Sequence, residues 1–226
     1  MVYFLFSPHW FYHIDSLFEL VTVIVAILVG FSSYKFYLIN KKKTFLDFSL
    51  AFLFIALSYI MKIIANIFIY SQDIQSRLVG DVVLWHYSFH RLELVQVVGY
   101  ISYRFFFLIS LLFLVTFCND SHKLRDRLLL FYFIIIITFF SSYSYFLFHI
   151  TAVVMLLIII PHYLKNYLTR SHATSLCVLG SFLLILFSQF FFIFVLFDSR
   201  LYVVGEFLQL VGYLLLLGTY IVVLRK

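Results

Sequence analysis

One eight-residue pattern occurs twice in this chain. Segment 93–100 reads ELVQVVGY, and segment 206–213 reads EFLQLVGY. On a helix, the glutamate, the glutamine three residues on and the tyrosine seven residues on share one face. Two weaker echoes, 11–15 with 147–151 and 56–58 with 186–188, keep the same order along the chain. The sequence therefore predicts two related halves, and repeated membrane proteins usually build their site between such halves.

The composition places the chain in a lipid bilayer. Hydrophobic residues make up 65% of the 226 residues and charged residues 12%, against roughly 45–50% and about 25% in soluble domains. A membrane-spanning helix needs about 20 mainly apolar residues. The sequence predicts an all-α fold with seven such helices and no soluble catalytic or output domain. The expected spans are 15–38, 45–70, 91–117, 127–146, 148–168, 173–197 and 202–224.

The echoes divide this single domain, 1–226, into two parts and a connector. Repeat one covers about 11–117, the connector helix about 127–146, and repeat two about 147–224. Three helices plus one connector make an even number, so the two repeats cross the membrane in the same direction. We therefore expect parallel three-helix repeats related by an axis along the membrane normal.

The distribution of basic residues predicts the orientation. Alternating loops place eleven Lys or Arg residues on one side of the membrane and three on the other. The positive-inside rule then predicts an outside N-terminus and a cytoplasmic C-terminus in the cell membrane. The net charge of +6 suits contact with anionic lipid. It does not indicate nucleic-acid binding, which needs a clustered basic face.

A helix order of three plus one plus three resembles that of the sugar-transporting SWEET and PQ-loop families. The chain departs from them because Pro161 has no partner proline in the other repeat and no Pro-Gln dipeptide occurs. Segments 33–37, SYKFY, and 52–59, FLFIALSY, are also loosely similar to small archaeal integral membrane proteins of no assigned activity. Neither resemblance implies a substrate.

Polar residues inside the expected spans are few, and such residues mark pairing or functional positions by default. At about 1.5 Å per residue, most fall in the outer third, and Arg104 alone reaches the middle. We expect an outward-facing polar pocket between the repeats, with Glu93 and Glu206 at its rim. The alternative is that these groups only fix helix packing, for example through a buried Lys62–Glu19 or Lys62–Glu93 ion pair. The candidate ligand-binding residues are Glu19, Lys62, Asn66, Glu93, Gln96, Arg104, Gln189, Glu206 and Gln209.

Several histidines indicate a possible metal site. A helix reaching back from the third span would align His86, His90 and Glu93 on one face, a spacing that can hold a metal ion. His13 and His149 occupy equivalent positions in the two repeats and could complete that site. No other cofactor is predicted.

Small residues allow helices to approach closely. Gly99 and Gly212 are expected to do so at the interface between the repeats, and Gly30, Gly180 and Gly218 to do so elsewhere.

Three functions remain open from the sequence. The repeats and the polar pocket favour a protein that binds or carries a small solute. The basic loops and the lack of an output domain suit a sensor or anchoring subunit that acts through a membrane or cytoplasmic protein partner. A metal-dependent membrane enzyme is the third, and the weakest, reading of the histidines.

Overall fold

The computed structural model describes residues 8–11, 13–78, 86–119, 124–141, 144–170 and 172–224, which are almost entirely helical. Six of the described helices are long and apolar enough to cross a membrane, which confirms a multi-pass helical membrane protein. The elements are η1 His9–Phe11, α1 Ile14–Asn40, α2 Lys43–Leu78, α3 His86–Asn119, α4 Leu124–Phe140, α5 Tyr145–Arg170, α6 Ala173–Ile193 and α7 Arg200–Leu224.

The fourth helix differs from the expected span of 127–146. α4 ends at Phe140 and has 17 residues, so it is about 26 Å long, short of the roughly 30 Å hydrocarbon layer. The Ser141 hydroxyl donates to the carbonyl of Thr138 at 2.7 Å. Serine side chains compete in this way for backbone groups and favour helix ends. The helix therefore ends where the apolar run meets the serines.

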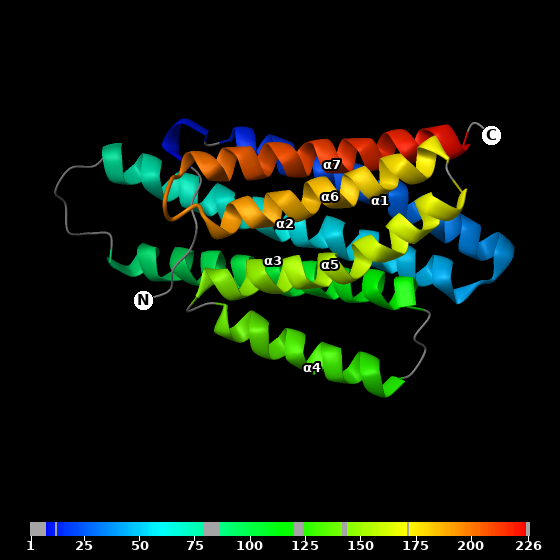
Figure 1. Cartoon of the computed structure of the whole chain (residues 1–226). Coiled ribbons are helices and arrows are strands. Elements are labelled where there is room, and N and C mark those ends of the chain that lie inside the picture. The colour runs from blue at the N-terminus through cyan, green and yellow to red at the C-terminus, as the bar shows by residue number, and fades with distance from the viewer. Residues whose placement is uncertain are drawn as a thin grey trace.

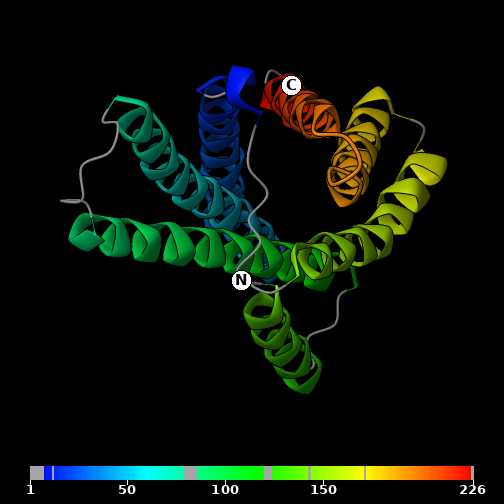
Figure 2. The same ribbon diagram turned by 90° about the vertical axis from the view of Figure 1, so that its left-hand side faces the viewer.

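Six helices form a closed ring. Neighbours in sequence pack together, α1 on α2, α2 on α3, α5 on α6 and α6 on α7, and the contacts α3 with α5 and α7 with α1 complete the ring (Figure 2). α4 packs on α3 and α5 from outside and stands apart from the other helices (Figure 1). Each ring helix therefore turns one side to the interior and another to lipid.

One end of the ring carries cationic side chains, most of them exposed. α1 ends with Lys41 in the left-handed conformation, and the Lys41 N–H donates to the Tyr37 carbonyl at 2.7 Å, a common helix C-cap. α2 begins two residues later, so the two helices form a tight hairpin at this end. We name it the basic end, after Lys35, Lys41, Lys42, Lys43, Arg125, Arg127 and Lys165.

Two glycines do allow close helix approach, but within the halves and not between them. A Cβ on Gly99 would lie 2.9 Å from the Cβ of Ala65 on α2. A Cβ on Gly212 would lie 3.0 Å from Ile185 Cγ1 and from the Ser181 carbonyl oxygen on α6. The tight contacts are thus α2 with α3 and α6 with α7, and the expectation of a glycine contact between the repeats is wrong.

The other three expected glycines differ in whether a second helix lies close to them. Gly30 has Leu53 of α2 at 3.2 Å from its virtual Cβ, so it too sits at a close helix contact. Gly180 and Gly218 have no described neighbour within 4 Å of theirs. The expectation of close approach is therefore wrong for these two positions.

Alanine substitution separates the two classes of glycine. Gly99→Ala and Gly212→Ala should each lower the free energy of unfolding by about 1–3 kcal/mol, because the methyl group overpacks a tight interface. Gly180→Ala and Gly218→Ala are the matched controls and should keep or raise stability, since alanine favours a helix over glycine by about 0.5–1 kcal/mol. Thermal unfolding of the detergent-purified variants measures this. Equal stability of all four variants would contradict the assigned helix interfaces.

Candidate functional site

A buried lysine joins two carboxylates from different helices. Lys62 Nζ on α2 lies 2.8 Å from Glu19 Oε1 on α1 and 2.6 Å from Glu206 Oε1 on α7. The three residues are at most 6% exposed. Charges removed from water must be paired, because an unpaired one costs several kcal/mol. The Lys62–Glu19 pair was expected as the packing alternative, and Glu206 joins it.

Asn66 and Tyr100 extend this network. Asn66 lies one turn from Lys62, and its Nδ2 is 3.1 and 3.2 Å from the two carboxylate oxygens of Glu19. The Tyr100 hydroxyl on α3 donates to Asn66 Oδ1 at 2.6 Å. We name Glu19, Lys62, Asn66, Tyr100 and Glu206 the polar layer. It connects α1, α2, α3 and α7 in one plane of the bundle.

Tyrosine rings surround the ammonium group. Lys62 Nζ is 5.9, 5.5 and 5.6 Å from the ring centroids of Tyr59, Tyr103 and Tyr202. Electron-rich ring faces attract a desolvated cation. Lys62 is therefore held by two carboxylates and by three tyrosine rings. Lys62, Glu19 and Glu206 together carry one net negative charge when both carboxylates are ionised.

Arg104 approaches the same region from α3, the neighbour of α2 in the ring. Its guanidinium donates to the carbonyl oxygen of Ser141 and lies 3.2 Å from the Ser141 hydroxyl. It also lies over the ring of Phe148 on α5, 5.9 Å from the centroid. Arg104 thus fixes the connection after α4 against α3, and the sequence offered no signal for Ser141 as its partner.

His149 and Gln189 form a second buried pair. His149 Nδ1 lies 2.9 Å from Gln189 Oε1, which joins α5 to α6. Gln189 Nε2 is buried and has no hydrogen-bond partner among the described residues. Buried polar groups are nearly always satisfied, so this amide marks a place where an added polar group would gain a hydrogen bond.

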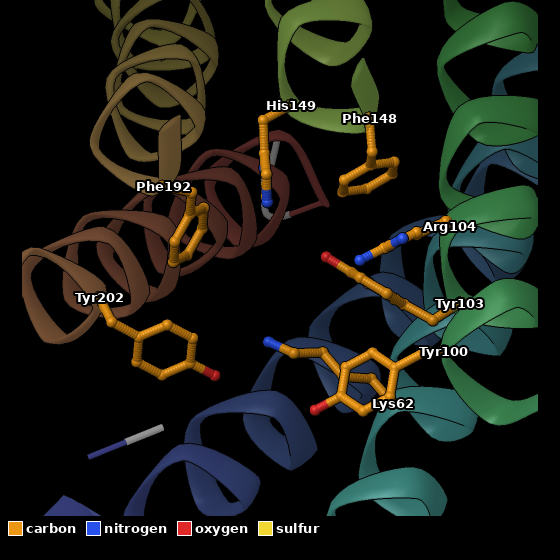
Figure 3. A pocket seen from close by; sticks show the side chains of 8 residues that line it. All are labelled: Lys62, Tyr100, Tyr103, Arg104, Phe148, His149, Phe192 and Tyr202. Atoms are coloured by element: carbon orange, nitrogen blue, oxygen red, sulfur yellow. The ribbon is translucent and has the colours of Figure 1, made fainter. Parts of the chain in front are cut away.

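A small cavity lies between these groups. Its volume is about 30 Å³, enough for about one or two water molecules. Figure 3 shows the side chains of Lys62, Arg104 and His149 pointing toward one space from α2, α3 and α5. The ring helices α2, α3 and α5 thus bring three candidate residues around one small polar site. The lining residues are Lys62, Tyr100, Tyr103, Arg104, Phe148, His149, Phe192 and Tyr202.

The remaining candidates have different surroundings. Gln209 is buried on α7 and donates to the Tyr59 hydroxyl. Gln96 is buried on α3. The side chain of Glu93 lies outside the described residues, so its place at the rim stays a prediction. Tyrosines were missed as site residues, although Tyr100 belongs to the repeated pattern and shares its face with Gln96.

The metal prediction stays untested. α3 begins at His86, so the expected helical extension back from the third span is confirmed. The side chains of His86, His90 and Glu93 lie outside the described residues. Within the described part of the chain, no three His, Cys, Asp or Glu side chains are grouped to hold a metal. His13 is exposed, and His149 is buried against Gln189.

A larger hollow lies at the opposite level of the ring. Its volume is about 270 Å³, and its lining comes from all six ring helices. The ring is therefore nearly filled at the polar layer and hollow toward the basic end. The principal lining residues are Phe36, Phe45, Phe48, Phe117, Tyr163 and Tyr220.

Comparison with known proteins identifies no relative: no protein-family model, no curated protein and no solved structure matches the chain. The function therefore has to be inferred from the geometry of the site.

The polar layer makes a sharp stability prediction. Lys62→Met leaves two buried carboxylates without their cation and should lower the free energy of unfolding by about 3–5 kcal/mol. The triple variant Glu19→Gln/Lys62→Met/Glu206→Gln removes all three charges and should recover most of that loss, since a neutral core often replaces a buried ion pair without cost.

Thermal unfolding in detergent measures both variants. Lys35→Met, at an exposed position of α1, controls for the loss of one lysine. A Lys62→Met protein as stable as Lys35→Met would show that the ion pairs contribute little.

Proposed function

We propose that the protein binds a small polar solute at the polar layer and carries it across the membrane. The observation that carries this proposal is the 2.6 Å contact of Lys62 with Glu206, because it links α2 of the first half to α7 of the second. An ion pair at such a junction holds the two halves together. It can also be exchanged, because a solute with an acceptor group can replace Glu206 as the partner of Lys62.

The order of helices around the ring supports two related halves. A two-fold rotation that exchanges α1 with α5, α2 with α6 and α3 with α7 would carry the α1–α7 contact onto the α3–α5 contact. In the second echo, Ser58 and Ser188 are fully buried and donate to the carbonyls of Ile55 and Ile185 at 2.7 and 2.8 Å. Gly99 and Gly212 likewise each pack on the preceding helix of their own half.

The uneven filling of the ring supports a carrier mechanism. The cavity of about 30 Å³ at the polar layer and the hollow of about 270 Å³ toward the basic end resemble one end-state of alternating access, closed on one side of the site and open on the other. In the predicted orientation, the basic end faces the cytoplasm. Separation of Lys62 from Glu206 would free α7 from α2 and open the closed side.

The lining of the cavity favours a solute with hydrogen-bonding oxygen atoms. Lys62, Arg104 and His149 present nitrogen atoms to it, and Tyr103 and Tyr202 supply hydroxyl groups and ring faces. Sugars, amino acids and nucleobases carry such oxygens and would enter once Lys62 and Glu206 separate, because the cavity as it stands holds only about one or two water molecules. The polar layer would bind the solute through Lys62 while the aromatic rings exclude water.

A sensor or anchoring subunit is the alternative, and α4 favours it. This helix lies outside the ring and exposes large apolar side chains on the faces away from α3 and α5. Leu128, Tyr132 and Phe139 are each about 60% exposed or more. A membrane partner that packs on α4 would co-purify with the wild-type protein in mild detergent.

A ligand screen tests the carrier. Detergent-purified protein is heated with sugars, amino acids, nucleobases and metal salts, and we expect one of the solutes to raise the melting temperature. A ligand at one hundred times its Kd stabilises by about 2.7 kcal/mol. Glu206→Gln should remove this shift, because it replaces the charge that positions Lys62.

Asp47→Asn is the matched control. Asp47 is also buried and is paired with Arg127 at 3.2 Å, but at the basic end. It should lose some stability and keep the ligand shift. Two results would contradict the proposal. The solute could raise the melting temperature of Glu206→Gln as much as that of the wild type, or proteoliposomes containing the protein could fail to take up a solute that binds.

A further inference from the structure

The hollow toward the basic end has an apolar part and a polar part. The apolar part, of about 270 Å³, is lined mainly by aromatic side chains, among them Phe36, Phe45, Phe48 and Phe117. An adjoining space of about 230 Å³ lies between the ends of α5, α6 and α7 and is lined by polar groups that include Asn166, His172 and Ser175. Tyr163, Val178 and Thr219 line both parts.

Tyr163 marks the junction with an unsatisfied group. The residue is 8% exposed, its ring stacks on Phe182 with centroids 4.7 Å apart, and its hydroxyl has no hydrogen-bond partner among the described residues. A buried hydroxyl without a partner destabilises the structure, because it has lost its hydrogen bond to water and gained none in return. A ligand whose polar atom reaches this junction would supply the missing hydrogen bond.

The charged side chains around the polar part favour a ligand that carries a negative charge. Lys41, Lys42, Lys43 and Lys165 are exposed at this end. Among the acidic side chains that the structure describes, Asp47 is the one at the basic end, and Arg127 holds it at 3.2 Å. A negatively charged group would therefore find cations at this end of the ring and little described acidic charge.

We propose that this hollow binds a single-chain anionic amphiphile. The hydrocarbon chain occupies the aromatic part, and the carboxylate or phosphate head accepts a hydrogen bond from the Tyr163 hydroxyl in the polar part. A free anion would leave the apolar part unfilled, and a neutral hydrocarbon would leave Tyr163 unsatisfied. The site shares no lining residue with the cavity at Lys62, so amphiphile binding goes beyond the proposed carrier and is measured apart from solute binding at Lys62.

Photolabelling tests the site in a bilayer. The full chain is placed in phosphatidylcholine nanodiscs with an oleate analogue that carries a diazirine in its chain, and adducts are mapped by mass spectrometry. We expect adducts on Phe45, Phe48 and Phe117. Unlabelled oleate or oleyl phosphate should compete at about one tenth the concentration of oleyl alcohol, since a hydrogen bond to a charged group is stronger than one to a neutral group. Whichever of oleate and oleyl phosphate competes at the lower concentration shows whether the head group is a carboxylate or a phosphate.

Three variants make the result specific. Tyr163→Phe removes only the hydroxyl and should weaken competition by oleate about tenfold without lowering the melting temperature, because it removes an unsatisfied group. Val178→Phe fills the junction and should abolish the adducts. Leu176→Phe adds a ring on the exposed side of the same helix and should leave them unchanged.

Three results would overturn the proposal. Adducts could spread evenly over the lipid-facing residues and persist in Val178→Phe. Oleyl alcohol could compete as well as oleate. Tyr163→Phe could keep the full effect of oleate. None of these results bears on solute binding at Lys62, which the Glu206→Gln screen measures.

Discussion

Lys62 is the residue on which the arrangement of the helices at the polar layer depends. Its ammonium lies within 2.8 Å of a carboxylate oxygen of Glu19 and within 2.6 Å of one of Glu206. In an apolar bundle none of these charges is tolerated alone. The position of α7 is therefore coupled to the hairpin of α1 and α2 by electrostatics, whereas the contacts within each half rely on close packing of small residues. The two kinds of contact differ in what can replace them: a polar solute or water can substitute for an ion pair, but nothing can enter beside Gly99.

Much of this arrangement follows from the sequence, and the reasons differ by residue. Apolar runs fix the six long helices, because length and hydropathy are local properties. The pairing of Lys62 with Glu19 is also predictable, since both lie at similar depth and a buried charge needs a partner. The end of α4 at Phe140 was missed because the expected span ran on through Ser141 to residue 146, whereas the competition of serine hydroxyls for the backbone decides the boundary. The glycine contacts were assigned to the wrong interface because depth along a helix does not reveal which neighbour a face meets.

The site itself was predicted only in part. Glu19, Lys62, Asn66 and Glu206 were expected in one layer, and they contact one another. Gln189 and Gln209 lie in separate pairs, with His149 and Tyr59. The partner of Arg104 is the backbone and hydroxyl of Ser141, and a backbone carbonyl carries no signature in a sequence. The tyrosines around Lys62 were hidden by the abundance of aromatic residues, since 22% of the chain is aromatic.

The pairing of Lys62 with Glu19 has a consequence for synthesis. Chains fold from the N-terminus as they are made, so α1 and α2 enter the membrane long before α7. Their hairpin already contains Lys62 and Glu19 in contact, so Lys62 can leave the insertion machinery with its charge already paired. Glu206 is synthesised last, when the ammonium group of Lys62 is already in place to pair with it. The chain therefore completes the ion network around Lys62 in the order of translation, and the buried Glu206 specifies where the final helix docks.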